Sequence, residues 1–587
     1  MENKSSIKYL ENLRHSCAHL LAAAVMELWP KAKRTIGPAI EDGFYFDFDF
    51  GDIKISEADF PKIEKKMHDI VSSWKSFKGK EVSEKEAKEA YKDNGYKIEL
   101  IEEFSKDSKK LTFYKSGNYS DLCRGGHVEK PNEELKYFRL LSVAGAYWRG
   151  NEKNKMLTRI YGTCWPTEKE LISYIERIEE AKKRDHRKIG KELELFTISD
   201  EVGRGLILWL PKGVVLRDEI EKLGKEVEAK YDYQRVVTPH IGKEQLYLTS
   251  GHLPYYAQDM WPPMEYEGEK YYLKPMNCPH MHMIYKFKQR TYRDLPLRLA
   301  EFGAVYRHED SGTLMGMMRV RGHTTNDAHL YCKEEDVIQE LVNVLEIHKY
   351  YYKLFGIKDY YVELALPDFI KKKDKYFDDP EAWKTSIELL RKAAKKSGIE
   401  VIEQEGSAAF YGPKFDFNIK SSIGREFGAS TNQLDFASGK RFGLTYVDKD
   451  GSEKIVPYIV HRAPLGSEER FIGFLIEHYG GAFPTWLAPV QAKILPITDR
   501  NLKYSQDLKT KLMDQMIRVE VDDRSETLQA KIRDAQMEKV PYMIVIGDKE
   551  EKTGELAVRN RAGKTEQFDL PKFIAKIKIE IDERSNL

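Results

Sequence analysis

The chain has 587 residues, of which 41% are hydrophobic and 33% are charged. A chain of this length exceeds what one hydrophobic core can organise, so three or four domains are expected. The 96 basic and 95 acidic side chains give a net charge of +1. This balance excludes nucleic-acid binding through bulk positive charge, and any RNA must be bound by local patches.

The chain carries no sign of a membrane segment or a secretory signal. No run approaches ~18 consecutive apolar residues, and the first ten residues are polar and charged. The cysteines are odd in number and widely spaced: Cys17, Cys123, Cys164, Cys278 and Cys332. That pattern is typical of a reducing compartment without a disulfide framework, so a cytoplasmic location and no membrane partner are expected.

The N-terminal third mixes helices with strands. Apolar residues recur every three or four positions over residues 9–22, which predicts a helix. Aromatic and acidic residues alternate over 43–50, which predicts a half-buried strand. Residues 57–110 are rich in Lys and Glu at helical spacing and are expected to form a solvated surface. A charged helix is predicted over 167–191, with Thr167 and Glu170 as its capping box and a basic face suited either to RNA or to solvation.

The middle of the chain predicts a different architecture from its C-terminal end. A helix over 214–231 is followed by strands at 234–239, 297–306, 360–366 and 456–461, without regular strand–helix alternation. This order favours an α+β layer with a mostly antiparallel sheet. After residues 484–489, strands at 492–497, 517–521, 542–546 and 555–559 alternate with helices. The alternation predicts a compact α/β domain with parallel strands.

Phosphate-binding residues occur without any glycine-rich phosphate loop. An ATP enzyme of this kind must neutralise phosphate charge with side chains, and the arginine fork binds two phosphate oxygens at once. Residues 300–309 form a strand that enters a loop, and the loop returns through 318–323 with R-x-E and further arginines. Residues 461–473 form a strand that turns into a helix with G-x-E-R. A single arginine in such a place is usually structural, but the combination is distinctive.

These segments resemble motifs two and three of the class II aminoacyl-tRNA synthetases, and the helix before Thr238-Pro239 resembles motif one. The closer resemblance is to the threonyl-tRNA synthetase family and covers essentially the whole chain. Its further motifs are PMNCP (275–279), MRVRG (318–322), DAH (327–329), AFYGPK (409–414), QLDF (433–436) and PTWLAPVQ (484–491). The resemblance implies a ligase that activates L-threonine with ATP and transfers it to tRNA(Thr).

The resemblance also implies a domain organisation. An α+β editing domain is expected over residues 1–165, a linker helix over 166–193, an α+β class II catalytic domain over 194–487 and an α/β anticodon-binding domain over 488–587. No counterpart is expected for the small ubiquitin-like domain that often precedes the editing domain in this family. Class II catalytic units usually pair across motif one, so a homodimer is expected.

Carried over by position, the ATP-binding residues are Arg307, Glu309, Arg319, His323 and Arg470. Arg307 is implied at the α-phosphate, Glu309 at the adenine amino group, and Arg319 and Arg470 at the outer phosphates. Positioning and charge neutralisation, with Mg²⁺ on the ATP, then carry the rate.

Lys414 is implied near the reacting carboxylate, which makes it the third catalytic residue beside Arg307 and Arg470. Three positions depart from the family pattern. His323 stands where an aromatic residue usually stacks on adenine, His280 where a glycine is usual, and Gly428 near a usual glutamine. Altered nucleotide contacts are expected there.

Cys278, His329 and His461 lie too far apart in sequence for their spacing to indicate a metal site. Each alone is more often a buried thiol or a core histidine. The resemblance matches them to a Cys/His/His set holding one Zn²⁺ per subunit, and three protein ligands leave a coordination position open.

Discrimination of threonine from valine explains such a metal. An apolar pocket separates these isosteres by only ~100-fold, whereas zinc can accept both the amino group and the side-chain hydroxyl. Asp327, Tyr411 and Gln433 match the residues that complete the pocket. Serine retains the hydroxyl, so mischarging with serine is expected.

Correction of that error is expected from the N-terminal domain. His15 and His19 share a helix face, and Cys123 and His127 repeat the same interval. By themselves these residues fit either a tetrahedral zinc site or packing. The resemblance implies hydrolysis of seryl-tRNA(Thr), with these four residues and Asp121 positioning a water, and leaves a metal there undecided.

At the C-terminal end, Glu550 and Arg559 match base-contacting positions of the anticodon-binding domain, while a usual asparagine is replaced by Ser525. Splayed anticodon bases are read on their edges, which suits a modest patch. A solvated face is the alternative for the basic residues of this region: Arg524, Lys531, Arg533, Lys549, Arg559 and Arg561.

The sequence leaves two other functions as alternatives. A synthetase-derived regulator would bind RNA without making aminoacyl-tRNA, and the departures at His323 and His280 keep it open. Among enzymes, the alternative is a seryl or a prolyl ligase. The editing signature and the Cys/His/His set argue against both of these specificities.

Overall fold

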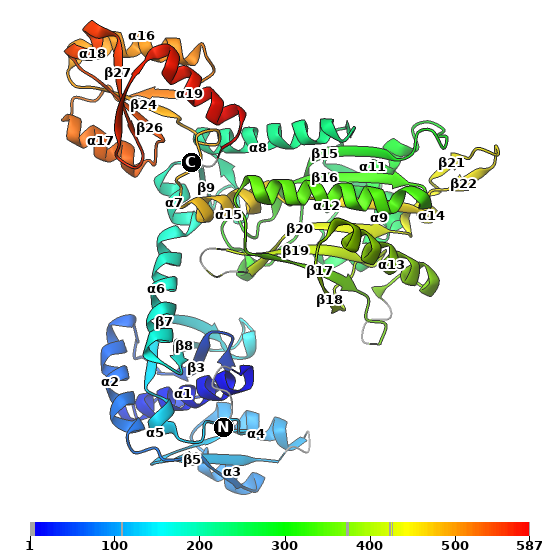
Figure 1. Cartoon of the computed structure of the whole chain (residues 1–587). Helices are drawn as coiled ribbons and strands as arrows, with labels where there is room; N and C mark the ends of the chain where they lie inside the picture. The colour runs from blue at the N-terminus through cyan, green and yellow to red at the C-terminus, as the bar shows by residue number, and fades with distance from the viewer. Residues whose placement is uncertain (1–5, 107–109, 371–374, 422–423, 425, 586–587) are drawn as a thin grey trace. The chain divides into compact units, whose positions relative to one another are not determined.

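The computed structural model describes residues 6–106, 110–370, 375–421, 424 and 426–585. It divides into two compact units, Met1–Glu179 and Glu180–Leu587. The helices and strands of both are labelled in Figure 1, where the colour follows the residue number. Among the helices of the described residues, none is both long enough and apolar enough to cross a membrane.

The first unit is built on helix α1 (Ile7–Leu28), as the apolar spacing predicted. Ser6 begins the helix by accepting the Tyr9 amide at 3.2 Å, and its central turns are buried. The sheet beside it has the order β1 (Lys33–Arg34), β3 (Gly43–Asp49), β8 (Met156–Trp165) and β7 (Tyr137–Tyr147), with β2 (Ala39–Ile40) also paired to β3. The strand predicted over 43–50 is therefore confirmed.

A second, smaller layer completes this unit. It holds the strands β4 (Lys78–Glu81), β5 (Thr112–Ser116) and β6 (Tyr119–Leu122), with the helices α3 (Glu84–Ala90) and α4 (Gly95–Lys106). The helix α2 (Phe60–Val71) packs against α1 in the main core, and the short α5 (Pro131–Glu134) follows β6 along the chain. The prediction that 57–110 is simply a solvated surface is wrong. Ile63, Met67 and Ile101 are fully buried, and Lys97 is only 3% exposed. Each charged helix carries an apolar stripe, and only the fold reveals what covers it.

Two helices follow the first sheet, α6 (Glu168–Arg184) and α7 (His186–Glu192). The predicted cap of α6 is present, because the Glu170 amide donates to Thr167 Oγ1 at 3.3 Å. The predicted single helix is broken at Asp185, whose carboxylate accepts the Arg187 amide at 2.8 Å and begins α7.

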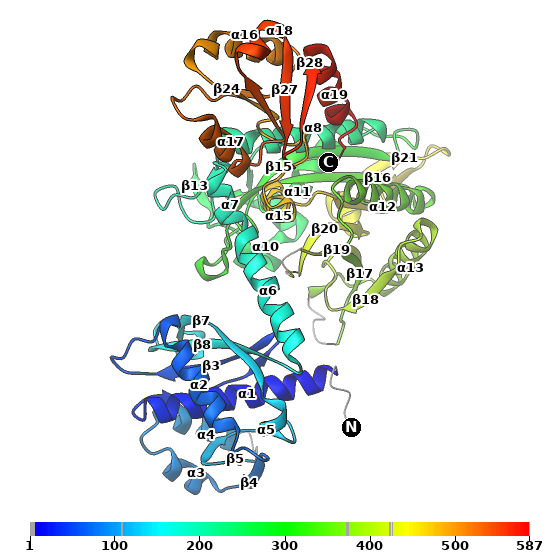
Figure 2. The same ribbon diagram turned by 60° about the vertical axis from the view of Figure 1, so that its left-hand side comes forward.

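The second unit is organised by an eight-stranded sheet (Figures 1 and 2). Its strands, in spatial order, are β11 (Gln234–Arg235), β15 (Leu297–Tyr306), β16 (Gly322–Cys332), β23 (Tyr458–Ala463), β20 (Glu426–Asp435), β19 (Lys414–Lys420), β17 (Tyr360–Leu366) and β18 (Val401–Glu405). All neighbours are antiparallel except the outer pairs β11–β15 and β17–β18. The predicted antiparallel α+β architecture is confirmed.

Four helices bury apolar stripes in the core beside this sheet: α8 (Pro211–Lys230), α12 (Val337–Leu354), α13 (Pro380–Ser397) and α15 (Glu468–Tyr479). The strand predicted over 234–239 is only two residues long. Its continuation leaves the ladder because Glu301 accepts both the amide and the hydroxyl of Thr238, at 2.9 and 2.7 Å, and Pro239 offers no donor.

Shorter elements surround the sheet. They are β9 (Phe196–Thr197), β10 (Leu208–Trp209), β12 (Ile241–Lys243), β13 (Met264–Tyr266), β14 (Glu269–Leu273), β21 (Thr445–Val447), β22 (Glu453–Ile455), α9 (Glu244–Ser250), α10 (His252–Tyr255), α11 (Cys278–Tyr285) and α14 (Ser438–Phe442).

The C-terminal part holds a five-stranded sheet in the order β25 (Val519–Val521), β24 (Ala492–Pro496), β26 (Tyr542–Ile546), β27 (Glu555–Asn560) and β28 (Thr565–Asp569). Its helices are α16 (Leu502–Met513), α17 (Leu528–Met537), α18 (Asp548–Thr553) and α19 (Leu570–Asp582). The three strands β25, β24 and β26 are parallel as predicted, but β27 and β28 run antiparallel. The short connection through α18 is too brief for a parallel crossover.

The buried His348 of α12 predicts how stability depends on pH. It is 0% exposed, its Nε2 lies 2.8 Å from Asn432 Oδ1, and burial lowers its pKa to about 3. The unfolded chain, with an ordinary histidine pKa, therefore binds more protons between these two values. Stability is lost as the pH falls from about 6.5 toward 3.

In His348→Phe this contribution is absent. The difference in unfolding free energy between the unaltered chain and the variant is expected to narrow by about 2 kcal/mol from pH 7 to pH 5. Urea unfolding followed by tryptophan fluorescence at the two pH values measures it. An equal difference at both would contradict the assignment.

Candidate functional site

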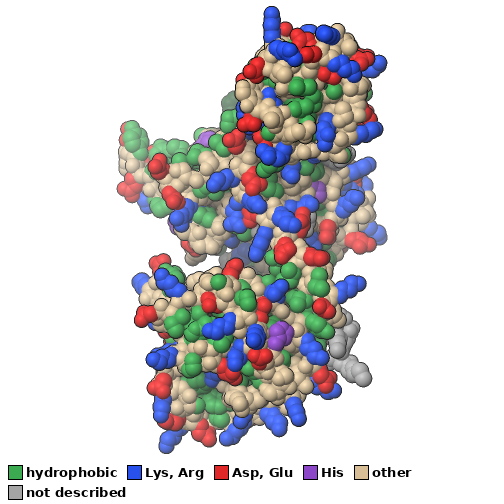
Figure 3. Space-filling view, turned by 90° about the vertical axis from the view of Figure 1, so that its left-hand side faces the viewer, with side chains coloured by type: hydrophobic (Ala, Val, Ile, Leu, Met, Phe, Trp, Pro, Cys, Tyr) green, Lys and Arg blue, Asp and Glu red, His purple; other side chains and the backbone are tan. Residues whose placement is uncertain are grey.

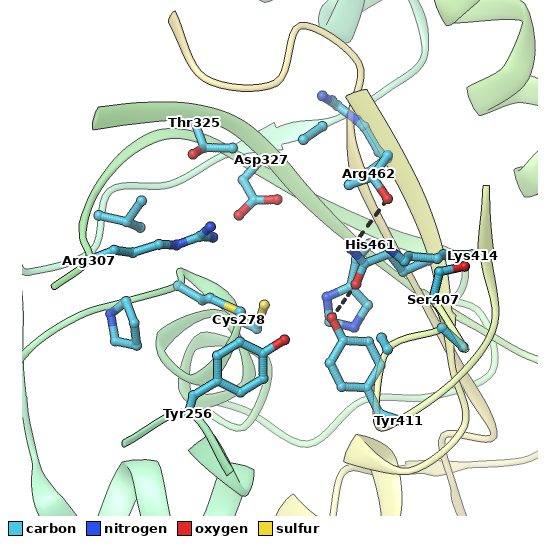
Figure 4. Close-up of a pocket in the computed structure, with 18 of the residues that line it drawn as sticks. Tyr256, Cys278, Arg307, Thr325, Asp327, Ser407, Tyr411, Lys414, His461 and Arg462 are labelled. Carbon is cyan, nitrogen blue, oxygen red and sulfur yellow. Dashed lines mark hydrogen bonds between the residues drawn. The ribbon is translucent and has the colours of Figure 1, made fainter. Parts of the chain in front are cut away.

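A cavity of about 370 Å³ lies in the second unit, bordered by the eight-stranded sheet and α11 (Figure 4). Residues expected from the sequence to bind the nucleotide, the amino acid and the metal meet here. Those that line the cavity are Cys278, Arg307, Asp327, Tyr411, Lys414, Gln433 and His461.

The three expected metal ligands converge although they are distant in sequence. Cys278 is the first residue of α11, whereas His329 and His461 lie directly opposite each other on β16 and β23. One ligand atom from each of the three lies within 4.8 Å of the other two. The arrangement is of the right size to share a single ion.

The free nitrogens of the two histidines point to the same conclusion. His461 Nε2 lies 3.0 Å from Asp435 Oδ2, which leaves Nδ1 buried and without a hydrogen-bond partner among the described residues. Both buried nitrogens of His329 also lack a partner there. Unpaired buried polar atoms are costly, and a carboxylate behind a histidine is the usual support of a metal ligand. The donor set fits a metal.

Burial keeps Cys278 and His329 neutral when no cation is bound. It raises the pKa of the Cys278 thiol well above its ordinary value, and the negative charges of Asp327 and Asp435 add to this effect. Burial likewise lowers the pKa of His329 well below its usual range. A divalent cation would reverse the preference of the thiol and hold it as thiolate.

Tyr411 and Gln433 form one wall of the cavity. Gln433 stands opposite His461 in the ladder between β20 and β23, and the Tyr411 hydroxyl donates to its Oε1. The Tyr411 ring stacks on His461 with centroids 5.2 Å apart. Both side chains therefore have a fixed orientation relative to the metal ligands.

Asp327 faces the same space from β16. Its Oδ2 accepts from Asn277 Nδ2 at 3.1 Å, and burial raises its pKa to about 6. The sequence offered no signal for Asn277, which precedes Cys278 and orients this carboxylate.

The arginines expected at the nucleotide form an electropositive group. Arg307 lines the cavity, and Arg470 donates to the carbonyls of Met318 and Gly428 at 3.1 and 2.9 Å. Burial lowers the pKa of Arg470, and the charges of Arg307 and Arg319 lower it further. Concentrated positive charge in a partly buried site favours an anion.

Glu309 and Arg319 pair with each other at 2.7 Å, so both must give up this contact to meet a nucleotide as expected. Lys414 pairs with Asp416 at 2.6 Å at the cavity wall.

The three departures from the family pattern have different structural meanings. His323 is half-buried near Arg307 and Arg470. Burial and these two positive charges lower its pKa to about 3, so its ring is neutral. His280 packs away from the cavity lining, with Nε2 3.2 Å from the Ile241 carbonyl. Gly428 supplies the carbonyl that Arg470 contacts.

Several lining residues carried no motif signal. They are Tyr256, Thr325, Lys375, Ser407 and Thr431. Thr325 and Thr431 were accessible to reasoning in principle, because each lies two residues from an expected site residue on the same strand and shares its face. The others come from loops whose path only the fold defines.

A second cavity, of about 610 Å³, lies in the first unit. The four expected residues His15, His19, Cys123 and His127 meet there, with ligand atoms all within 4.8 Å. His15 Nε2 lies 3.2 Å from His19 Nε2 and 3.4 Å from Cys123 Sγ, and Cys123 Sγ lies 3.3 Å from His127 Nε2. Unlike the first set, this cluster satisfies most of its polar atoms internally.

Burial keeps this cluster neutral as well. It lowers the pKa of His127 to about 3 and raises that of Cys123 to about 11. The His127 ring is further anchored by Ser16, whose Oγ lies 3.2 Å from Nδ1. The geometry is compatible with a bound metal and with a metal-free site that holds a water.

Asp121 lines the second cavity at its base and is 1% exposed. It accepts from Lys97 at 2.8 Å and from the hydroxyls of Tyr91 and Tyr119 at 2.6 and 2.9 Å. Burial opposes its ionisation, but the charges of Arg34 and Lys97 outweigh burial and hold its pKa below the usual range. Lys97 is thus a cavity residue that sequence reasoning missed.

In the C-terminal part, the structure gives Glu550 and Arg559 different settings. Glu550 Oε2 accepts the Gly547 amide at 3.0 Å at the start of α18, while Arg559 is half-buried on β27. Two of the basic residues in this region are structural. Lys531 is 3% exposed and donates to the carbonyls of Pro496 and Asp522.

Arg561 is the other structural cation. It donates to the carbonyls of Ala482, Phe483 and Lys539, and burial lowers its pKa to about 10. A solvated face does not describe Lys531 or Arg561.

Comparison with known families matches three segments of the chain. Residues 263–479 match the model for the tRNA synthetase class II core domain (G, H, P, S and T), and residues 491–580 match an anticodon binding domain. Residues 111–161 match the threonyl and alanyl tRNA synthetase second additional domain.

Individual relatives are similar over nearly the whole chain. The chain is 46% identical to a threonine–tRNA ligase of Sulfurihydrogenibium sp. over 98% of this chain and 89% of the relative. It is 48% identical to a threonine–tRNA ligase of Cytophaga hutchinsonii over 94% of this chain and 85% of that one.

Among solved structures, the RNA binding domain of threonyl-tRNA synthetase from Cryptosporidium parvum is 34% identical, with a TM-score of 0.64. That similarity covers 67% of this chain and 98% of the solved chain. With its class II core, anticodon-binding and editing-associated domains, the chain belongs to the threonine–tRNA ligase family.

Proposed function

We infer that this protein ligates L-threonine to tRNA(Thr), through a threonyl-adenylate made from ATP, and hydrolyses mischarged seryl-tRNA(Thr). One observation carries the first activity. Cys278 and His461, from a Cys/His/His set with orphaned nitrogens, line the same cavity as Arg307, and the positive charge of the half-buried Arg470 lies near Arg307. An amino acid held at the former would present its carboxylate to a nucleotide held at the latter.

Cys278, His329 and His461 would hold one Zn²⁺. When bound, the ion supplies a Lewis acid that recognises the amino and hydroxyl groups of threonine and leaves valine without a partner. Gln433 and Tyr411 are oriented by their mutual hydrogen bond to close around the side chain. Asp327 would accept a hydrogen bond from the same amino group of the substrate.

The remaining residues act on the nucleotide. The threonine carboxylate attacks the α-phosphorus, and the bond to pyrophosphate breaks with its electron pair leaving on pyrophosphate. Arg307 would neutralise the α-phosphate, and Arg319 and Arg470 the outer phosphates together with Mg²⁺. The neutral His323 ring would stack on adenine, Glu309 would accept its amino group, and Lys414 would steady the reacting carboxylate.

Removal of the thiol ligand tests the metal and the activation step together. Cys278→Ala is expected to lose bound zinc and to lower kcat/KM for threonine-dependent pyrophosphate exchange by at least ~100-fold, because two remaining ligands hold zinc poorly. Metal analysis and an exchange assay with a panel of amino acids measure both.

The matched control is Cys332→Ala, which removes another buried thiol, one that donates to the Leu330 carbonyl. It is expected to retain zinc and exchange. Full activity in Cys278→Ala would refute the metal assignment, while exchange with serine or proline in place of threonine would redirect the specificity. Absence of exchange in the unaltered, zinc-loaded chain would favour an RNA-binding regulator.

The editing proposal rests on the second cavity. His15, His19, Cys123 and His127 would position a water against the ester of seryl-tRNA(Thr), with Asp121 held ionised by Lys97 below them. The family model matched to residues 111–161 supports this reading.

The double variant His15→Ala/His19→Ala is expected to charge threonine at the unaltered rate and to accumulate Ser-tRNA(Thr), because activation uses other residues. Deacylation of preformed Ser-tRNA(Thr) should fall by at least ~100-fold, the contribution of one positioned acid–base group. His68→Ala, on the exposed side of α2, is the control. Undiminished deacylation by the double variant would remove these histidines from the reaction.

Binding of tRNA is proposed through local contacts that include Glu550 and Arg559. On the face shown in Figure 3, basic and acidic side chains are interspersed, as the net charge of +1 requires. Recognition by base edges in a small patch fits this surface better than a broad electrostatic attraction.

A homodimer is supported by exposed apolar side chains beside motif one. Val237 is 90% exposed and Phe287, just after α11, is 87% exposed, and the two segments meet where His280 contacts Ile241. Contiguous exposed apolar patches mark interfaces, and the proposal takes these two side chains as parts of one patch.

Val237→Glu together with Phe287→Glu is expected to shift the sedimenting species from dimer to monomer, because buried charge would oppose association. Met516→Glu is the control, since Met516 is 86% exposed on the C-terminal part. A monomeric unaltered chain, or a double variant that sediments as a dimer, would refute the interface.

A further inference from the structure

A buried side-chain cluster outside both cavities connects α7 to the arginine-bearing loop between β15 and β16. Asp185, His186 and Glu477 have ligand-type atoms within 4.8 Å of one another, and the side chains of His186 and Glu477 are each 1% exposed. Helices α7 and α15 lie beside each other in both ribbon views (Figures 1 and 2). The pair of His186 and Glu477 is therefore sealed from solvent, whereas the Asp185 side chain at the start of α7 is 21% exposed.

The hydrogen bonds of His186 assign its tautomer. The backbone amide of Met317 donates to Nε2 at 3.0 Å, so this nitrogen carries no proton. Nδ1 then carries the proton and donates to Glu477 Oε1 at 2.7 Å. With both ring nitrogens engaged, His186 has no lone pair left for a metal.

Asp185 is committed elsewhere as well. Its carboxylate begins α7 by accepting the Arg187 amide at 2.8 Å and also accepts Arg187 Nη2 at 2.6 Å. The cluster is therefore a hydrogen-bond network rather than a cation site. In it a buried carboxylate orients an imidazole, and the imidazole accepts a hydrogen bond from one backbone amide.

The amide that is held lies next to the nucleotide arginines. Met318 follows Met317, and its carbonyl accepts Arg470 Nε at 3.1 Å. Arg319 comes next, and its own carbonyl closes the turn by accepting the Met315 amide at 3.2 Å. A shift of the Met317 amide would therefore displace Arg319 along the chain. It would also move the Met318 carbonyl, which is an acceptor of Arg470.

The loop is shaped to approach the imidazole. Gly316 has φ +52°, and a Cβ at that position would collide with His186 Nε2. Gly473 of α15 faces the same place, where a Cβ would lie 3.1 Å from Met317 Cβ. Both glycines leave the space that the close contact needs.

We propose that His186, oriented by Glu477, is a positioning residue for ATP: it holds the Met317 amide so that Arg319 and Arg470 meet the outer phosphates. This rests on the proposed ATP-dependent function and extends it to residues that touch no substrate. Loss of the His186 hydrogen bonds should leave the binding of threonine, at the other end of the cavity, unchanged.

The test is a split between the two substrates in threonine-dependent pyrophosphate exchange. His186→Phe keeps a ring of similar shape without hydrogen bonds and is expected to raise the KM for ATP about 10-fold, the effect of one lost buried hydrogen bond. The KM for threonine should stay within about 2-fold. His186→Gln can accept from Met317 and donate to Glu477, and it should recover most of the ATP affinity.

Controls separate positioning from general damage. His478 lies on α15, the helix that carries Glu477. His478→Phe removes its contact with the Phe355 carbonyl at 3.1 Å and should leave the KM for ATP unchanged. If His186→Phe does not fold, Gly316→Ala decides, because its Cβ displaces the imidazole. Gly268→Ala, with φ +78° and open space around it, controls for backbone strain.

Three outcomes would overturn the proposal: an unchanged KM for ATP in both His186→Phe and Gly316→Ala, an equal rise in both KM values, or the loss of a bound metal ion from His186→Phe. The last would make the cluster a cation site. If the unaltered chain shows no exchange at all, the proposed function fails first. If the unaltered chain catalyses exchange, and both His186→Phe and Gly316→Ala leave the KM for ATP unchanged, only this inference is refuted.

Discussion

The pairing of β16 with β23 is the constraint on which the site depends. The antiparallel ladder sets His329 opposite His461, and the next ladder sets Gln433 opposite His461. A slip of one residue in either register would turn these side chains to the other face of the sheet. Backbone hydrogen bonds, which carry no chemistry of their own, therefore bring together two imidazoles that are distant in sequence, and the start of α11 adds the thiol of Cys278.

Buried ionic contacts keep that ladder in place. Arg462, adjacent to His461, donates to Glu228 of α8 at 2.9 Å and to Asn326 of β16 at 3.2 Å, so the motif-one helix and both central strands share one network. Removing one partner from such a buried pair typically costs ~3–5 kcal/mol, because the other charge is left without compensation. Buried polar side chains are paired in the same way elsewhere. In the first unit Asp121 pairs with Lys97 and Arg34, and at α7 Glu477 orients His186.

Sequence reasoning succeeded where the signal was local. The strands over 297–306, 360–366 and 542–546 have the predicted bounds, since runs of β-branched and aromatic residues bounded by turns leave little choice. It failed where burial decided the outcome. The sequence favoured solvated positions for three cations, Lys97, Lys531 and Arg561. Each instead donates to carbonyl or carboxylate acceptors, and the acceptor of a charged side chain cannot be predicted from its charge alone. Likewise, the single helix expected over 167–191 is broken at Asp185 because the chain there must deliver His186 to the core.

By itself, the sequence determined the family and the α+β class, because motif order and residue types can be read along the chain, and it proposed the residues of the site. Only the tertiary structure decided that Cys278, His329 and His461 share one small volume, that the nitrogens facing it have no other partner among the described residues, and that Met317 is held by His186. The physical reason is that these are long-range contacts: strand register and helix packing select which distant residues meet, and neither leaves a mark in local sequence.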